Sequence, residues 1–593
     1  METRGSNPRL VLGETITAGG FLLDKFAIAN ALREIGVLLE LKGENPYKAR
    51  AYENGAAAVE GIVEDLGQIV DDKQLTKVRG IGEVLAAKIA ELYNTGRSSL
   101  LDELRNELPP GIIELSQIPG LSTKKVQALH DALGISSIAE LQSACDLGAV
   151  SKIKGFGEKT QQKILEGIKE YETKDESILL LDARHLSKQL TDYFKWAPGV
   201  TSVTVAGSMR RWKETIKNIN LIITSNEPAK AIEALEKFPL VTKMEISEES
   251  RAVARLANGL RVKLLITNSE QFPYAEFMET GSDSHIEEVQ ALAKGKGLRL
   301  GVTGLFKGTK KIACQSEQDI YKELGLPYIP PELREANGEL QEVASGNDFS
   351  DLVEIEHIQG MTHCHSTYSD GKNSIEEMAL AAEAMGMKYI TITDHSPAAH
   401  YAGGVTIEQL KRQWEEIDQV QERVKIKLLR GTESDILDSG ALDYPDHVLD
   451  KFDILIGSIH SRLKMDEDQM TKRLIHCMRL PQFKIWGHAL GRLVLRRPPL
   501  SCRLEEVLDA AAESNVAIEV NGDPYRLDME ARWIKLARKR GIKFVISTDA
   551  HGIKDLHNLK YGIHMARRGG LSRSEVLNTL PTDQFQKAVA PVR

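Results

Sequence analysis

Histidine and carboxylate side chains gather in the last part of the chain, and their types and spacing suit metal chemistry. Of the 15 histidines, 12 follow residue 350. Nine potential ligands stand at or near the ends of short apolar segments: His363, His365, Asp370, His395, Glu433, His460, His488, Asp549 and His551. Imidazole and carboxylate ligands without thiolates suit Zn²⁺, Mn²⁺ or Fe²⁺.

The spacing of these residues indicates more than one ion. His363 and His365 are two residues apart, as are Asp549 and His551. Alternation along a strand places such a pair on one face. At about three or four protein ligands per ion, the set would hold about two or three ions. Two metals about 3.5–4 Å apart can activate a water and stabilise the leaving oxygen of a phosphoryl displacement. For any single histidine, a hydrogen-bonded core position is the alternative.

The elements that must position these ligands are short strands separated by helices. From residue 357 onward, apolar segments such as 388–395 and 544–551 alternate with helical stretches. This spacing predicts βα units around a parallel sheet or barrel. In such folds, sites are built at the carboxyl ends of the strands, where most of these polar residues stand.

The middle of the chain presents a different pattern. Residues 175–340 alternate predicted strands and helices. Within one apolar strand, Asn218 and Asn220 fall on the same face, after a glycine turn and basic residues at 207–211. They are amides, whereas a Mg²⁺ site there would need carboxylates. The segment 327–356 is rich in proline and charge without periodicity, so we interpret it as a linker.

Three glycine-containing segments recur among the predicted helices of residues 21–170, at 78–89, 118–129 and 153–164. Glycine permits a tight turn, after which a helix presents free N–H groups that can cradle a phosphate. This is the helix-hairpin-helix pattern of sequence-independent DNA binders; ordinary glycine-capped corners are the alternative. The candidate DNA-binding residues are Gly80, Gly82, Gly120, Gly155, Gly157, Lys124 and Lys159.

Length and composition limit the class of protein. A chain of 593 residues predicts about three to five domains. With 42% hydrophobic and 27% charged residues, it is typical of globular proteins, and no apolar run suits a membrane span. The five cysteines form no CxxC pair and the N-terminus lacks a secretion signal, so we expect a cytoplasmic protein. The net charge of −9 disfavours a uniformly basic surface but permits local contacts with DNA. Monomer is the default expectation.

Specific motifs carry a resemblance that covers the chain from about residue 21 to its end. The segments HCHSTYSD (363–370), GTESDIL (431–437) and STDAH (547–551) resemble the PHP (polymerase and histidinol phosphatase) domain. GENPYKARAYENGA (43–56), GSMRRWKE (207–214) and TGSDSH (280–285) resemble bacterial family X DNA polymerases. The whole chain is similar to a family X polymerase with a C-terminal PHP domain.

The resemblance implies a multidomain α and α/β fold. We expect an N-terminal lyase-like helical domain with a helix-hairpin-helix at 1–100 and a fingers-like helical domain at 101–174. A nucleotidyltransferase-like palm and thumb would occupy 175–340, a linker 341–356, and a PHP domain with a distorted (β/α)7 barrel 357–593.

The resemblance also implies the roles of the nine ligands. His363, His365, Glu433 and Asp549 would hold a first ion and form the catalytic set. Glu433, bridging, would hold a second ion with His460 and His488. Asp370, His395 and His551 would hold a third. The implied chemistry is Mn²⁺-favoured phosphoester hydrolysis, including 3′–5′ exonuclease, DNA 3′-end and abasic-site processing, with Zn²⁺ or Fe²⁺ as other possible metals. Arg492 is a candidate for binding the substrate phosphate, with a rim salt bridge as the alternative.

The palm departs from the family pattern at the positions that hold its polymerase metals. The family has three aspartates where this chain has Asn218, Asn220 and Lys263. Three carboxylates carry about −3, whereas two amides and one ammonium carry about +1. Mg²⁺ requires anionic oxygen, so we do not expect it there. Trp212 also replaces the glycine of the phosphate-binding turn. We therefore expect a palm that has kept its fold and lost its reaction.

The main hypothesis is a DNA-repair nuclease acting on gapped, nicked or 3′-ended DNA without sequence preference. Three alternatives stay open: a gap-filling family X polymerase, a PHP phosphatase for small phosphate esters, and a non-enzymatic DNA-end scaffold.

Overall fold

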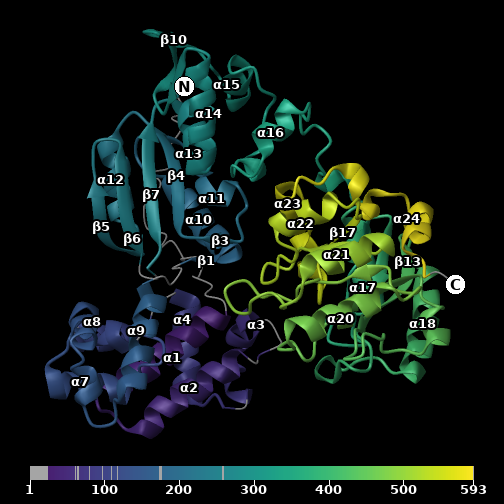
Figure 1. The fold of residues 1–593 in the computed structure, drawn as a ribbon, viewed down its shortest axis with the longest axis horizontal. Helices are drawn as coiled ribbons and strands as arrows, with labels where there is room; N and C mark the ends of the chain where they lie inside the picture. The colour runs from purple at the N-terminus through teal and green to yellow at the C-terminus, as the bar shows by residue number, and fades with distance from the viewer. Residues whose placement is uncertain are drawn as a thin grey trace, which may run out of the picture. The chain divides into compact units, whose positions relative to one another are not determined.

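The computed structural model describes residues 25–591 apart from 61, 63–65, 79, 96–97, 109, 117, 173–176 and 257–258. The chain divides into two compact units, Met1–Asp175 and Glu176–Arg593 (Figure 1). The N-terminal segment examined for a secretion signal lies outside the described residues.

The first unit is helical, as the sequence predicts. Its buried core is aliphatic and includes Leu32, Ile89 and Leu129. The α-helices described are α1 (Lys25–Leu41), α2 (Pro46–Glu60), α3 (Leu66–Asp71), α4 (Glu83–Thr95), α5 (Ser99–Glu107), α6 (Pro110–Ser116), α7 (Thr123–Leu133), α8 (Ile138–Asp146) and α9 (Glu158–Glu172).

The three predicted glycine turns have the conformation that requires glycine. Gly80, Gly120 and Gly155 have φ angles of +98°, +79° and +92°. The helices α4, α7 and α9 each begin three residues later. A Cβ placed on Gly82, Gly120, Gly155 or Gly157 would meet nothing within 4 Å. Lys124 and Lys159 lie in the first turns of α7 and α9. The backbone beside these helix ends is thus open, as a phosphate cradle requires.

The second unit begins with a mixed sheet in the strand order β2-β4-β7-β6-β5, in which only β4 and β7 are parallel neighbours. This palm sheet carries helices α10 (Leu180–Phe194) and α12 (Pro228–Glu236), and a short helix α11 (Gly207–Arg210) follows β2. Its strands are β2 (Val200–Ala206), β4 (Asn218–Ser225), β5 (Val241–Ser247), β6 (Arg251–Leu256) and β7 (Arg261–Thr267).

The thumb follows with its own apolar core, which includes Phe277, Val289 and Tyr321. It contains α13 (Phe272–Thr280), α14 (Asp283–Gly295), β8 (Leu298–Gly301), β9 (Gly304–Lys307), β10 (Lys310–Ile312) and α15 (Glu317–Glu323).

The segment interpreted as a linker, residues 327–356, lies in the second unit. It contains α16 (Glu339–Ala344), and Arg334 within it is fully buried. The Arg334 guanidinium binds Glu317 at 2.5 Å, Nη1 to Oε1. Buried charged residues lack the apolar periodicity from which packing is predicted, which explains why the sequence pattern missed this segment.

The last part of the chain forms a parallel seven-stranded sheet in chain order. Its strands are β11 (Gly360–Met361), β12 (Tyr389–Ile392), β13 (Lys427–Asp435), β14 (Ile454–Ser458), β15 (Ile485–Trp486), β16 (Ala517–Asn521) and β17 (Phe544–Ser547). A parallel bridge between Cys364 and Ala550 joins the segments after the first and last strands. The sheet therefore closes into the distorted (β/α)7 barrel that the resemblance implied.

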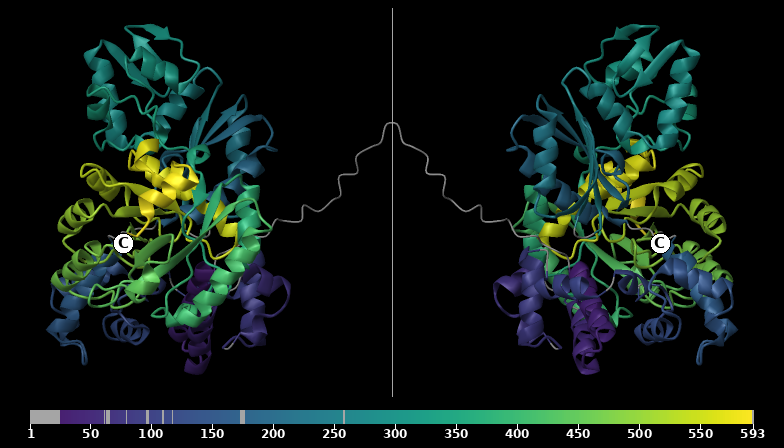
Figure 2. Two further views of the ribbon diagram at one scale, coloured as in Figure 1. Left: turned by 90° about the vertical axis from the view of Figure 1, so that its right-hand side faces the viewer. Right: turned by 90° about the vertical axis from the view of Figure 1, so that its left-hand side faces the viewer.

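Helices separate the barrel strands and cover them. Between the strands lie α17 (Ile375–Ala384), α18 (Ile407–Gln421), α19 (Asp446–Leu449), α20 (Glu467–Met478), α21 (Leu504–Glu513) and α22 (Ala531–Arg538), and α23 (Leu559–Arg568) and α24 (Thr582–Val589) follow β17. Tyr389 of β12 stacks on Phe585 of α24 at 4.7 Å between ring centroids. Figures 1 and 2 show α23 (yellow) beside the palm.

Trp212 joins the palm to α23. Its indole stacks on His564 with ring centroids 3.6 Å apart, and it meets Tyr561 edge to face at 5.6 Å. Its φ of +56° is a left-handed conformation that favours glycine. The aromatic contacts offset that strain. The tryptophan therefore places an interdomain contact in the turn that the resemblance implies for phosphate binding.

The neighbouring Glu214 is held between two arginines of the barrel domain. It forms a hydrogen bond with Arg568, and Arg492 Nη2 lies 3.4 Å from its Oε1. Burial alone would raise the pKa of Glu214, but the two guanidinium groups lower it to about 2. The Glu214 carboxylate is therefore ionised in the folded protein at neutral pH.

We predict that Glu214→Ala destabilises the second unit by about 3–5 kcal/mol, because it leaves Arg492 and Arg568 without this buried partner. Urea unfolding of the full chain measures the loss. The control is Glu233→Ala, which breaks an exposed ion pair with Lys237 and should cost less than about 1 kcal/mol. Equal losses in the two variants would contradict the interface assignment.

Three glutamates with arginine or histidine partners, Glu214 among them, make the stability of the second unit sensitive to acid. Glu214, Glu317 and Glu332 have folded pKa values of about 2, below the ordinary value of 4.5. Their stabilisation is present above about pH 4.5 and is lost as the pH falls toward 2. We predict that the urea midpoint falls less steeply with decreasing pH for Glu214→Gln than for the wild type, because the variant lacks one of these titrating groups. Parallel curves for the two chains would contradict the low pKa of Glu214.

Candidate metal centre

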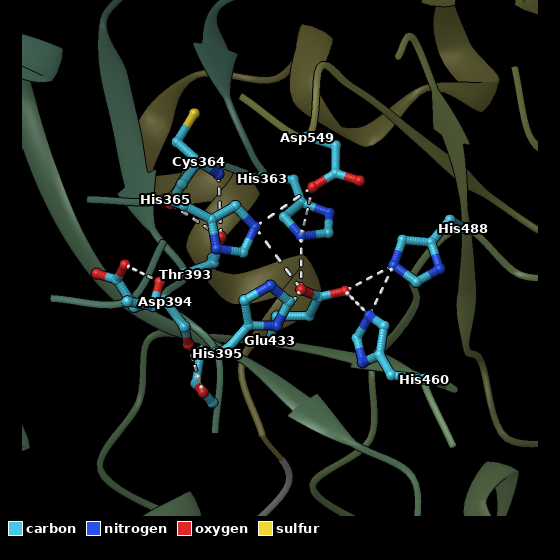
Figure 3. A network of polar contacts seen from close by, with 12 residues as sticks. His363, Cys364, His365, Thr393, Asp394, His395, Glu433, His460, His488 and Asp549 are labelled. Carbon is cyan, nitrogen blue, oxygen red and sulfur yellow. Dashed lines mark hydrogen bonds and ion pairs between the residues drawn. The ribbon is translucent and has the colours of Figure 1, made fainter. Parts of the chain in front are cut away.

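The nine predicted ligands meet at the carboxyl end of the barrel, and Figure 3 shows His363, His365, His395, Glu433, His460, His488 and Asp549 among them. Six of the seven strands lead into them, because parallel strands present their carboxyl ends at one edge. His363 and His365 follow β11, His395 follows β12, Glu433 lies in β13, His460 follows β14, His488 follows β15, and Asp549 and His551 follow β17. Asp370 lies in the turn after His365.

Glu433 stands at the centre of this cluster with no solvent exposure. Five imidazoles surround its carboxylate, as far as the described residues extend. His363, His365 and His395 lie 3.4, 3.6 and 2.9 Å from Oε2, and His460 and His488 lie 3.3 and 2.7 Å from Oε1. A carboxylate with imidazoles on both oxygens can bridge two cations.

Three groups of potential ligands lie close enough to hold ions, each with its donor atoms within 4.8 Å of one another. They are His365, Asp370, His395 and His551; His363, His365 and Asp549; and His395, Glu433 and His460. His488 joins the last group through a nitrogen 3.3 Å from that of His460. These groups overlap more than the predicted assignment of ligands to three ions does. His365 and His395 each belong to two of the groups.

The donor set fits metal ions. His363 Nε2, His365 Nδ1 and Nε2, His395 Nδ1 and Glu433 Oε2 are buried and have no hydrogen-bond partner in the part of the chain described. The three imidazole nitrogens His363 Nε2, His365 Nε2 and His395 Nδ1 lie within ion-pair distance of Glu433 Oε2, but they are not aligned for hydrogen bonds. Unpaired buried polar atoms are costly, and cations between them would remove that cost. Neutral imidazole and carboxylate suit borderline divalent metals.

The protonation of the imidazoles follows from their neighbours. Burial, followed by the imidazoles of His551 and His395, lowers the pKa of His365 to about 3. Its ring is neutral at neutral pH and keeps a lone pair for a ligand bond. Burial also opposes charge on His460, but Glu433 and Asp435 raise its pKa to about 9. Likewise Asp370 and Asp549 raise the pKa of His551 to about 9 against its burial. A metal must displace protons from these two rings.

Residues that support the ligands were not assigned from the sequence. Glu519 Oε1 lies 2.6 Å from His363 Nδ1, and Glu519 Oε2 accepts a hydrogen bond from the backbone N–H of His488. Asp435 Oδ2 lies 3.2 Å from His460 Nδ1. These contacts orient each ring so that its other nitrogen faces Glu433. One signal was available, because Glu519 is a single carboxylate inside the apolar strand β16.

Arg526 contacts the predicted ligand Asp549, and Arg492 in turn contacts the backbone at Arg526. Arg526 Nε lies 3.2 Å from Asp549 Oδ2. Arg492 donates from Nε to the carbonyl of Arg526 at 2.9 Å and also binds the carbonyl of Leu527. The Arg492 guanidinium, with Glu214 and Glu530 beside it, is thus occupied by protein partners. Phosphate binding by Arg492 stays a prediction.

The palm presents no comparable cluster among the residues that the structure describes, since all three ligand groups lie in the barrel domain. Asn220 and Lys263 are paired neighbours on β4 and β7, as are Asn218 and Arg261. The strands thus place two cations beside the two amides. Arg210 is also occupied, by Glu317 at 2.7 Å and Glu276 at 3.3 Å.

Helix-hairpin-helix units, a palm and thumb, and a metallophosphoesterase-like barrel define a polymerase-type chain with a hydrolase domain. Family models agree: a helix-hairpin-helix domain matches residues 24–98, a SAM-like helix-hairpin-helix tandem 112–170, a DNA polymerase beta thumb 276–335, and a PHP domain 362–523.

Relatives place the chain in a family. It is 35% identical over 562 residues to the DNA polymerase/3′-5′ exonuclease PolX of Bacillus subtilis (strain 168), covering 94% of this chain and 97% of that protein. The chain therefore belongs to the family X DNA polymerases with a C-terminal PHP domain. A probable phosphatase of Thermoanaerobacter sp. (strain X514) is 32% identical over 237 residues, or 37% of this chain and 89% of that protein. No described helix has the length and apolar character to cross a membrane.

We predict that Glu519→Gln lowers the affinity for Mn²⁺ by about 10–100-fold, because an amide cannot accept from both His363 and the His488 N–H. Isothermal titration calorimetry with Mn²⁺ measures this. The control Glu505→Gln alters an exposed carboxylate that pairs with Arg540 and should leave the affinity unchanged. Wild-type affinity in Glu519→Gln would contradict a supporting role for Glu519.

Proposed function

We propose that this chain is a metal-dependent DNA phosphodiesterase of the family X–PHP type, a 3′–5′ exonuclease that processes DNA 3′ ends or abasic sites in DNA repair. The observation that carries the proposal is the contrast between two sites. The barrel keeps nine potential ligands, with the buried Glu433 at their centre, whereas the palm offers Asn218, Asn220 and Lys263.

The barrel residues would hold two or three ions, with Mn²⁺ as the favoured metal. His363, His365, Glu433 and Asp549 would hold the first, Glu433, His460 and His488 the second, and Asp370, His395 and His551 the third. Bound there, such ions lower the pKa of a water and stabilise the leaving oxygen of a phosphodiester.

The protein's own side chains prepare that chemistry. Glu519 accepts from His363 Nδ1–H and so directs Nε2 toward Glu433. Asp435 does the same for His460. Arg526 holds Asp549 from the side opposite His365, through its other carboxylate oxygen. Each ligand is therefore oriented before a substrate arrives, which lowers the cost of reorganisation.

DNA would be held by the helix-hairpin-helix units through its backbone, without sequence preference. The glycines at Gly80, Gly82, Gly120, Gly155 and Gly157 open the helix N-termini to a phosphate, and Lys124 and Lys159 add positive charge. Gapped, nicked or 3′-ended DNA is the proposed substrate class.

Loss of polymerase activity is part of the proposal. Three cationic or neutral side chains cannot replace the carboxylates that nucleotidyl transfer requires. Trp212 occupies the phosphate-binding turn and packs on His564. A gap-filling polymerase is the alternative, since the Bacillus subtilis relative is named for a polymerase activity as well as a 3′-5′ exonuclease activity.

A small-molecule phosphatase is the second candidate, because curated relatives of the barrel domain alone are named probable phosphatases. Hydrolysis of p-nitrophenyl phosphate at a rate above that of DNA cleavage would favour this candidate over the nuclease.

We predict that His363→Ala lowers Mn²⁺-dependent cleavage of 3′-ended DNA by more than about 100-fold while DNA binding stays near wild type. Gel analysis of 5′-labelled DNA and fluorescence anisotropy measure the two properties. His476→Ala, an exposed histidine on α20, is the matched control and should cleave normally. Retained cleavage by His363→Ala would falsify the site.

A further inference from the structure

A cationic pocket of about 540 Å³ lies between α10 of the palm and α23 of the barrel domain. Its basic lining residues are Arg184, His185, Lys188, Arg210 and Lys560. None of its described lining residues is Asp or Glu. A neighbouring pocket lined by Arg496 and Arg497 also contains Glu214 and Glu530. The α10–α23 pocket therefore has an excess of positive charge in a chain whose net charge is −9.

Arg184 carries an uncompensated charge in this pocket. Its guanidinium lies 3.9 Å from the centroid of the Trp212 ring. Among the described residues, no carboxylate lies in ion-pair range of it. Burial lowers the pKa of Arg184, although Tyr561 opposes this shift. An arginine held on an aromatic face is ordered and keeps its edge available for a bidentate acceptor.

Lys560 provides a second uncompensated charge from the opposite wall. It is exposed, and its ammonium lies 5.3 Å from the centroid of the Tyr561 ring. Burial, followed by the charge of Arg184, lowers its pKa. Lys188 and Arg210 are partly neutralised by Asp192 and Glu317. Arg184 and Lys560 thus repel each other across a space that an anion would fill.

The surroundings define the chemistry of that anion. Trp212 stacks on His564 and lies against Arg184, so its ring is not free to stack on a base. What the pocket offers is charge and N–H donors, because the hydroxyls of Ser187 and Thr191 already donate to the carbonyls of Arg184 and Lys188. These groups suit a phosphate and carry no means of reading sequence.

We propose that the α10–α23 pocket binds a backbone phosphate of the DNA strand, as a contact separate from both the helix-hairpin-helix units and the metal centre. The inference rests on the proposed function, since DNA is its ligand. It gives the palm a use that does not require its polymerase metals. The pocket joins two domains, so the contact would fix the path of the strand between them.

The test measures how DNA affinity depends on salt. Each phosphate contact contributes about 0.9 to the slope of log K against log of salt concentration. Arg184→Ala and Lys560→Ala should each reduce the slope by up to about 0.9, and the double variant, which loses the one phosphate that both residues hold, by about 0.9. Fluorescence anisotropy of the full chain supplies the affinities. The labelled DNA has 3′-terminal phosphorothioate linkages, which resist cleavage.

The controls separate charge loss from unfolding. Lys560 is exposed, so Lys560→Ala retains the fold even if Arg184→Ala loosens the Trp212 stack. Arg532→Ala removes an arginine that lies over Trp533 at 4.5 Å but pairs with Glu530, and its slope should match the wild type. A wild-type slope in both Lys560→Ala and Arg184→Ala would overturn the inference.

A second arm tests the source of the phosphate. If a deoxynucleoside triphosphate binds the wild type more tightly than Lys560→Ala in a direct titration while the two chains have equal DNA salt slopes, the pocket binds free nucleotide and the DNA assignment fails. These slopes are independent of hydrolysis. A wild-type chain that binds DNA without cleaving it in Mn²⁺ would contradict the proposed function. The salt slopes would still decide whether the α10–α23 pocket binds a DNA phosphate.

Discussion

The buried carboxylate of Glu433 is the constraint on which the barrel domain depends. It has no solvent exposure and lies among five imidazoles within the described structure. Burying so many polar groups is unfavourable unless positive charge bridges them. The barrel supplies the geometry, because its parallel strands deliver ligands to one edge and the Cys364–Ala550 bridge brings its first and last strands together. The fold thus creates an electrostatic cost that metal ions would remove.

The palm contributes to this arrangement through side-chain contacts with the barrel domain. Glu214 binds Arg492, Arg492 binds the carbonyls of Arg526 and Leu527, and Arg526 binds Asp549. Direct contacts therefore connect the turn at residues 207–214, to which the resemblance assigns phosphate binding, to a predicted metal ligand. Trp212 packs on α23 at the same interface. These contacts give the palm a structural role beside the barrel, whatever reaction the palm itself supports.

The sequence predicted the barrel and the nine ligands because both follow simple periodic rules. Apolar strands at regular spacing indicate a parallel sheet, and residues such as His395 and Asp549 mark strand ends. The glycine turns were equally accessible, since positive φ at Gly80, Gly120 and Gly155 requires that residue.

The supporting contacts could not be predicted, because they join residues far apart in sequence. Glu519 reaches His363 from 156 positions away, and nothing in a strand's own pattern identifies its partner. The ordered segment around Arg334 was missed because it packs through buried charge. Trp212 was interpreted as an obstacle to phosphate, and only the structure reveals its stacking on His564.

The central claim is that hydrolysis resides in the barrel and that the palm does not polymerise. The most direct measurement follows a 5′-labelled primer on a gapped template with Mn²⁺, with and without deoxynucleoside triphosphates. The account predicts that the primer shortens in both reactions. Extension of the primer when nucleotides are present would contradict it, because Asn218, Asn220 and Lys263 would then support the catalytic metal after all.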